Sequence, residues 1–159
     1  TIILNQGCRP EEIMSARKCD LDVEASTLTI PGGKSRAARR VLHLTPRSEE
    51  VLAARLMTQG PWLFPSERYP GNHITKLNNS HDRACIAAGV SFVLYDLRHT
   101  FGTRQATELK TDPFTLAAMM GHSNLRTIMR YVHPDQTAQK DAMERYATAQ
   151  RRRKFKRVK

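Results

Sequence analysis

One segment, residues 20–45, sets the limits on how this 159-residue chain can fold, because its pattern differs from everything around it. Residues 26–30 (STLTI) favour a β-strand, 31–34 (PGGK) are typical of a turn, and 40–44 (RVLHL) alternate polar and apolar side chains. This order predicts an antiparallel hairpin, with a third short strand near residues 21–23. The flanking segments carry helix signals, so we expect an α+β fold, a mostly helical domain with a small antiparallel sheet.

The helix signals are prolines where helices should begin and glycines where they should end. Proline suits the first helical turn because the missing N–H has no partner there, and glycine tolerates the left-handed conformation that ends many helices. The short helix after Ser123 or Asn124 should carry Tyr131 in its last turn. One helix is expected to begin at Pro10, one at Pro46, and one to cover about 73–88. A further helix has Asp96 as its N-cap, and the last two run from Pro113 to Gly121 and over residues 135–149.

Charge is concentrated at the C-terminal end. The net charge is +11, and residues 151–159 hold seven Lys or Arg and no acid, which leaves +4 for the rest of the chain. A polycationic arm favours a polyanionic partner, and nucleic acid fits better than a membrane surface because the arm has no amphipathic repeat. The alternative is a solvated, disordered tail.

The rest of the sequence argues against disulfides, membrane-spanning segments and cofactors. Cys8, Cys19 and Cys85 form no CxxC pair and are odd in number, so we expect reduced core thiols. No signal peptide or apolar run of membrane length is present, which predicts a soluble cytoplasmic protein. Paired carboxylates and a P-loop are also missing from the sequence, so we expect no metal, nucleotide or other cofactor.

Five separated residues carry the candidate chemistry: Arg9, Lys34, Arg98, His122 and Tyr131. Arg9 precedes a helix start, with Glu12 near enough to hold its side chain. Lys34 sits at the hairpin tip, and His122 follows a helix-ending glycine.

The helix with Arg98 holds three further residues of interest. Tyr95, three residues before Arg98, can face the same site, and Gly102 leaves room for a close approach. His99 is interpreted as a core histidine without a catalytic role.

This set suits a phosphodiester. A pentavalent phosphoryl transition state carries about two negative charges, which guanidinium groups stabilise by bidentate hydrogen bonds. Lysine can protonate a departing alkoxide, and tyrosine can attack as a nucleophile. A phenol with a pKa of about 10 is only about 0.1% ionised at pH 7, so the site must favour the phenolate.

The chain resembles the catalytic domain of the tyrosine recombinase (phage integrase) family over nearly its whole length. Residues 7–13 (GCRPEEI) resemble the first-arginine box, and 33–34 (GK) stand where the hairpin lysine is expected. Residues 97–101 (LRHTF) resemble the second-arginine box, and 120–123 (MGHS) followed by Tyr131 resemble the third box and the nucleophile.

The resemblance implies site-specific DNA recombination by transesterification, without metal or ATP. Tyr131 would form a 3′-phosphotyrosyl link, Arg9, Arg98 and His122 would bind the phosphoryl group, and Lys34 would protonate the 5′-oxygen. Double-stranded DNA and further protomers of the same protein would be the partners. A type IB topoisomerase, and a DNA-binding module without turnover, remain alternatives. Side chains expected to contact DNA are Arg36, Arg39, Arg151, Arg152, Arg153 and Lys154.

Two departures from the family pattern stand out. The family usually has histidine three residues before the second arginine, where this chain has Tyr95, which can donate a hydrogen bond but is a poor base at neutral pH. Nothing corresponds to the N-terminal DNA-gripping domain. We therefore expect an N-terminally truncated catalytic domain over residues 1–150 and a basic tail over 151–159, and the segment after residue 135 could be exchanged between protomers.

Overall fold

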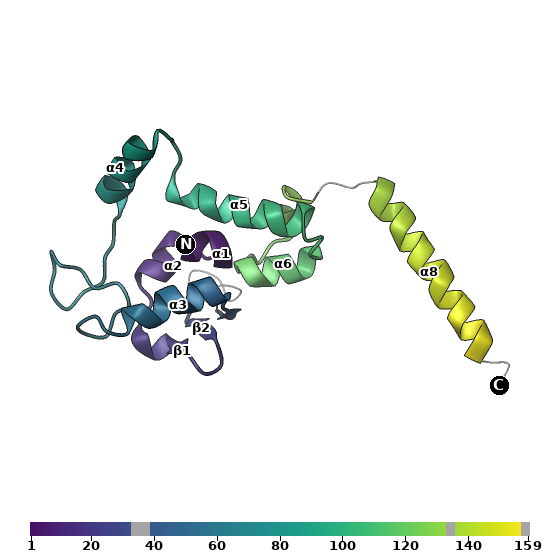
Figure 1. Ribbon diagram of the computed structural model, residues 1–159, viewed down its shortest axis with the longest axis horizontal. Helices are drawn as coiled ribbons and strands as arrows, with labels where there is room; N and C mark the ends of the chain where they lie inside the picture. Colours follow the sequence, from purple (N-terminus) through teal and green to yellow (C-terminus); the bar gives the residue numbers. More distant parts are fainter. Residues whose placement is uncertain (33–38, 133–135, 157–159) are drawn as a thin grey trace.

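The computed structural model describes residues 1–32, 39–132 and 136–156, and it is mostly helical with one small sheet (Figure 1). The sheet consists of β1 (Leu21–Asp22), β2 (Thr27–Ile30) and β3 (Arg40–His43). The helices are α1 (Ile2–Gln6), α2 (Pro10–Met14), the 3₁₀ helix η1 (Lys18–Asp20), α3 (Pro46–Arg55), α4 (Asn78–Ala88), α5 (Leu94–Thr107), α6 (Pro113–Met120), α7 (Arg126–Met129) and α8 (Gln136–Lys156). The α+β prediction is confirmed.

The three strands are antiparallel in the order β1-β2-β3. Leu28 pairs with Leu42, and Ile30 pairs with Arg40. Leu28, Ile30 and Leu42 are buried, so the alternation of the strands places one apolar face against α1 and α3. The hairpin is as predicted, but its tip, with Lys34 and Arg36, lies outside the described residues.

Two apolar clusters meet along α5. The first joins α1 and α2 to the sheet and α3, and the second joins α5 to α6, α7 and Tyr131. Helix α5 lies against both α1 and α6 (Figure 1). The side chains on α5 therefore face the seam between the two clusters.

Several predicted boundaries are wrong. Helix α4 begins at Asn78 rather than near His73, because His73 forms an isolated β-bridge with Pro65. Helix α5 begins at Leu94, so Asp96 is not its N-cap; its carboxylate instead accepts a hydrogen bond of 2.9 Å from the Val93 backbone N–H, one turn back.

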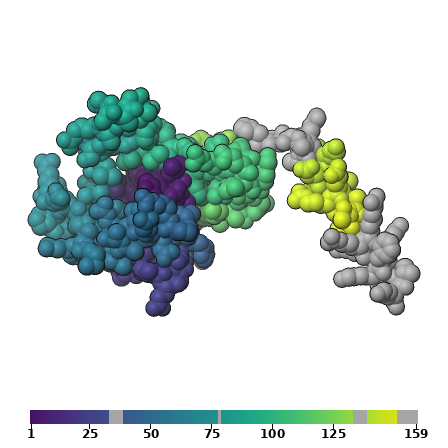
Figure 2. Space-filling view, in the orientation of Figure 1, coloured from purple at the N-terminus to yellow at the C-terminus, as the bar shows by residue number. Residues whose placement is uncertain are grey.

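The C-terminal elements also differ from the expectation. Helix α7 ends at Met129, so Tyr131 lies in the turn beyond it rather than in its last helical turn. Helix α8 extends into the basic tail as far as Lys156, and Figures 1 and 2 show it standing apart from the other elements. Between residues 1 and 156, outside the gaps named above, no helix is both long and apolar enough to cross a membrane.

The cysteine prediction is only partly right. All three are free thiols, and Cys8 and Cys85 are buried, but Cys19 is exposed. Burial raises the pKa of the Cys8 thiol to about 12, so this thiol stays protonated at neutral pH.

Candidate active site

Arg98 is the centre of the site, and its side chain is fully buried. It projects from α5 beside Leu97 and Phe101, which pack into the first and second clusters. The Arg98 guanidinium donates to the Gly7 carbonyl (2.5 Å) and to the Met120 carbonyl (2.7 Å). A single side chain thus ties the loop after α1 to the end of α6.

Gly7 makes this arrangement possible. It ends α1 with a φ of 62°, and a Cβ at this position would overlap the Phe101 ring. Any other residue would carry both backbone strain and a clash. The glycine therefore lets the loop approach α5 closely enough for its carbonyl to reach Arg98.

A second arginine, Arg9, approaches from the N-terminus of α2. Its guanidinium donates to Glu12 (2.7 Å) and to the Gly121 carbonyl (3.1 Å). The contact with Glu12 is the one that the spacing predicts, and the Glu12 carboxylate also accepts from the Arg9 backbone N–H. Arg9 and Arg98 thus converge on the same turn at the end of α6.

A third arginine completes the cluster. Arg40 of β3 forms two hydrogen bonds to Glu12, of 3.1 and 2.8 Å, and one to the Met119 carbonyl of 2.9 Å. Burial by itself raises the pKa of the Glu12 carboxyl, but the hydrogen bonds from Arg40 and from the Arg9 backbone outweigh it and hold that pKa below its ordinary value. Glu12 is therefore ionised at neutral pH and orients two arginines at once.

His122 lies where Gly121 ends α6 with a φ of 67°. Arg98 donates to the Nε2 atom of His122 at 2.7 Å, which requires a neutral imidazole with its hydrogen on Nδ1. Burial and the charges of Arg98, Arg9 and Arg40 lower the pKa of His122 to about 4. At neutral pH His122 is thus an uncharged N–H donor.

Tyr131 packs against α5, in the same apolar cluster as Phe101. Its ring is buried and lies over Gly102, where a Cβ would come within 3.0 Å of Tyr131 Cζ. The close approach that Gly102 allows is therefore taken by the tyrosine ring. The Tyr131 hydroxyl lies 2.6 Å from the Nδ1 atom of His99.

Tyr95 borders the same group of side chains. The Arg98 guanidinium lies 6.0 Å from the centre of the Tyr95 ring, and the Tyr95 and His99 rings meet edge to face at 5.0 Å. Tyr95 is partly exposed, so its hydroxyl has access to a ligand at the surface of the site.

The predicted residues divide into those that the structure brings together and those that it does not describe. Arg9, Arg98 and His122 are linked by hydrogen bonds at the turn that ends α6, and Tyr95 and Tyr131 lie near Arg98. Lys34 and Arg36 fall in the undescribed hairpin tip, and the side chains of Arg151, Arg152, Arg153 and Lys154 are not described either.

The sequence interpretation missed two residues, Arg40 and His99. The strand pattern over residues 40–44 includes Arg40 but assigns it no role, although its position relative to Val41 and Leu42 places it on a defined strand face. His99 was interpreted as a core histidine, although its spacing of four residues from Tyr95 places both on one face of a helix.

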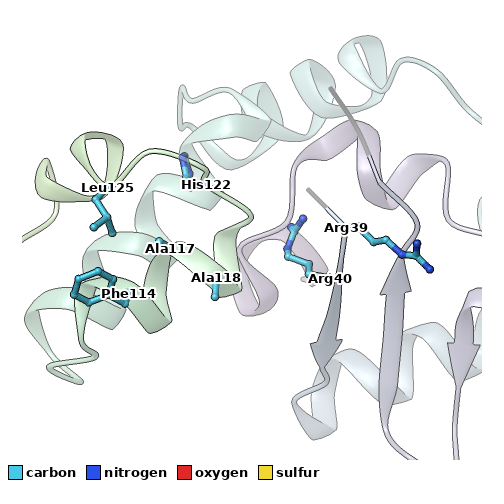
Figure 3. Close-up of a pocket in the computed structure, with 7 residues that line it drawn as sticks. All are labelled: Arg39, Arg40, Phe114, Ala117, Ala118, His122 and Leu125. Carbon is cyan, nitrogen blue, oxygen red and sulfur yellow. The ribbon is translucent and has the colours of Figure 1, made fainter. Parts of the chain in front are cut away.

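A cavity of about 440 Å³ opens beside this cluster, lined by Arg39, Arg40, Phe114, Ala117, Ala118, His122 and Leu125 (Figure 3). Figure 3 shows the two arginines on the strand side and the apolar residues on and after α6. Arg39, one of the predicted DNA contacts, is exposed and lies at this cavity. Within the described part of the chain, no three His, Cys, Asp or Glu side chains gather in a way that could hold a metal ion.

Comparison with known proteins shows the family to which the chain belongs. Residues 1–138 match the model of the Phage integrase family. The chain belongs to this family. Among curated relatives, it is 31% identical over 130 residues to prophage integrase IntF of Escherichia coli K12, a match that covers 76% of this chain and 27% of the relative. It is 24% identical over 152 residues to tyrosine recombinase XerA of Pyrococcus furiosus, covering 91% of this chain and 52% of XerA.

Solved structures agree on the fold of this phage integrase family member. It superposes with a TM-score of 0.75 on the Tn1549 transposon integrase in complex with circular intermediate DNA, at 20% identity, covering 91% of this chain and 57% of that one. The XerA recombinase structure gives a TM-score of 0.66 at 19% identity, covering 91% of this chain and 53% of XerA. The chain therefore spans between 27% and 57% of the length of these proteins.

Proposed function

We propose that this chain is the catalytic portion of a site-specific DNA recombinase that cuts and rejoins strands through Tyr131. The observation that carries the proposal is a cluster of three arginines at the end of α6, with a tyrosine hydroxyl bonded to α5 nearby. Arg9 and Arg40 pair with the Glu12 carboxylate, and Arg98 donates to the Met120 carbonyl. Three guanidinium groups and one carboxylate leave about two positive charges, which matches the charge of a pentavalent phosphoryl transition state.

Each proposed role follows from the side chain's chemistry. Arg9 and Arg98 bind the non-bridging phosphate oxygens, and His122 donates a hydrogen bond from its neutral imidazole. The buried Nε–H of Arg98 has no hydrogen-bond partner among the residues that the structure describes, which leaves it as a further donor in this proposal. Tyr95 contributes a hydrogen bond rather than a base.

The reaction is a transesterification. The Tyr131 oxygen forms a bond to phosphorus while the bond from phosphorus to the 5′-oxygen breaks, and Lys34 gives that oxygen its proton. The 3′-phosphotyrosyl link keeps the phosphodiester energy, so a 5′-hydroxyl of another strand can attack it and release Tyr131. All of these roles belong to side chains, so adduct formation should be unaffected by EDTA.

The partners follow from the reaction. Double-stranded DNA is the substrate, contacted by Arg36 and Arg39 near the hairpin and by the basic tail, residues 151–159. Exchange of strands requires further protomers on the same DNA. Residues 1–150 form the catalytic domain in this proposal, working on DNA in the cytoplasm.

A covalent-capture experiment tests the proposal without knowledge of the target sequence. The chain is incubated with nicked duplexes that carry a randomised segment, and denaturant-stable protein–DNA adducts are isolated and sequenced. Wild type should yield adducts, and Tyr131→Phe should yield none. If wild type and Tyr131→Phe both bind DNA but neither forms an adduct, the chain is a binding module and the proposal is wrong.

The same substrates separate recombination from DNA relaxation. A recombinase should join the captured strand to a second duplex only when it carries the selected sequence. Relaxation of supercoiled plasmid without strand exchange would instead favour a type IB topoisomerase.

A further inference from the structure

The contact between His99 and Tyr131 joins α5 to the turn after α7. The His99 Nδ1 atom lies 2.6 Å from the Tyr131 hydroxyl oxygen, within the range of a strong hydrogen bond. The two ring centres are 5.9 Å apart and the rings are tilted by 45°. His99 therefore meets the reacting atom of Tyr131 with a ring nitrogen rather than with a ring face.

The surroundings hold this contact in place. Tyr95, His99 and Gly102 follow one another at spacings of four and three, so they share one face of α5. Tyr95 contacts the His99 ring from one side, while Gly102 admits the Tyr131 ring at van der Waals distance. Substitution of Gly102 by any larger residue would push the phenol away from the imidazole.

The nucleophile needs a proton acceptor in this position. Burial raises the pKa of Tyr131 above its ordinary value of 10.0, while the charges of Arg130 and Arg98 act in the opposite direction. The hydroxyl is thus protonated at neutral pH. Its proton must leave as the bond to phosphorus forms.

The neighbouring groups in the described structure are poor acceptors. His122 already accepts from Arg98 through Nε2, and its pKa of about 4 makes it a weak base. Glu12 is occupied by Arg9 and Arg40.

We propose that His99 is a catalytic residue that accepts the proton of the Tyr131 hydroxyl through Nδ1. As the phenol oxygen bonds to phosphorus, its proton passes to His99, which becomes imidazolium, and the 5′-oxygen leaves with a proton from Lys34. In the reverse step the incoming 5′-hydroxyl gives its proton to Lys34 as its oxygen bonds to phosphorus, and the departing phenol oxygen recovers its proton from His99. This inference rests on the proposed function.

Three substitutions test it in single-turnover adduct assays on the captured duplexes. His99→Ala removes the acceptor, and His99→Asn keeps a hydrogen-bond acceptor near the position of Nδ1 but cannot take up a proton. General base catalysis contributes about 10²–10⁴-fold, so both variants should slow adduct formation by at least about 100-fold. His43→Ala, which alters an exposed histidine on β3, should match wild type.

Two readouts distinguish proton transfer from packing. Imidazole in the buffer should restore adduct formation in His99→Ala. The dependence of the rate on pH should differ between wild type and His99→Asn, because only the imidazole can take up a proton at this position. The titrating and charged groups that face this contact are Tyr95 and Arg98 on α5 and Arg130 beside Tyr131. His99→Asn at wild-type rate would overturn the proposal.

A measurement on the DNA-free chain is independent of activity. Nitrogen-15 NMR should show Nδ1 of His99 as an unprotonated acceptor near neutral pH, with a shift that changes in Tyr131→Phe. A hydrogen on Nδ1 would overturn the proposal, because a protonated nitrogen accepts nothing. If wild type forms no adduct, the proposed function fails by itself, and this NMR result still decides whether His99 is poised to accept the Tyr131 proton.

Discussion

Gly102→Ala should damage the reaction far more than the fold. The added Cβ would lie 3.0 Å from Tyr131 Cζ and 3.1 Å from each Cε atom. Carbon atoms prefer separations of about 3.5–4.0 Å, so the ring must retreat by about 0.5 Å. Overpacking of this kind costs about 1–3 kcal/mol, whereas alanine improves helix stability by about 1 kcal/mol over glycine. The free energy of unfolding should therefore fall by about 0–2 kcal/mol.

The effect on the reaction should be larger because the ring carries the proposed nucleophile. A displacement of about 1 Å in a catalytic group can lower a rate about 100-fold, so a shift of half that size should cost at least about 10-fold. Urea unfolding measures stability, and single-turnover adduct formation measures the reaction. Thr103→Ala, which alters an exposed neighbour on α5, is the matched control and should leave the rate unchanged. If Gly102→Ala forms adducts at the wild-type rate, the contact between Gly102 and the Tyr131 ring does not position the nucleophile.

The other predictions concern the arginine cluster and the tail. Glu12→Gln should lower the free energy of unfolding by about 3 kcal/mol in urea, because the half-buried Arg9 and the buried Arg40 lose their carboxylate; a loss below about 1 kcal/mol would contradict this. The pKa of Glu12 is lowered in the folded protein, so the carboxylate stabilises the fold fully above its unfolded pKa of about 4.3. This stabilisation is lost as the pH falls through the folded pKa. The urea midpoints of wild type and Glu12→Gln should therefore converge in acid. Arg98→Lys should reduce adduct formation at least about 100-fold, because an ammonium cannot reproduce the paired contacts of the guanidinium; cleavage at the wild-type rate would remove Arg98 from the site. Deletion of 151–159 should weaken nonspecific DNA binding and flatten its dependence on salt, and an unchanged slope would exclude the tail from DNA contact.

The local backbone around the candidate residues could be predicted from the sequence. Pro10 and Glu12 predicted a helix start beside Arg9, and Gly121 predicted the loop that presents His122. Such signals are readable because they depend on backbone preferences within one turn of chain. The roles of Lys34 and of the basic tail stay predictions.

Other features depend on contacts between distant segments. Arg40 meets Glu12 across 28 positions, and Arg98 meets Gly7 across 91. No local pattern specifies which buried carbonyl an arginine will find, because that depends on how the sheet and α6 close around α5. For the same reason the sequence misplaced Cys19, which is exposed, and the start of α4, which is at Asn78.

Tyr131, the proposed nucleophile, shows most clearly what the sequence determines and what depends on the tertiary structure. The sequence by itself determined an α+β chain of the phage integrase family with arginines, a histidine and Tyr131 in a characteristic order. Only the tertiary structure decided that Tyr131 lies over Gly102 with its hydroxyl on His99. The physical reason is that the 32 positions between His99 and Tyr131 are closed by packing of α6 and α7, and only that packing brings an imidazole to the phenol.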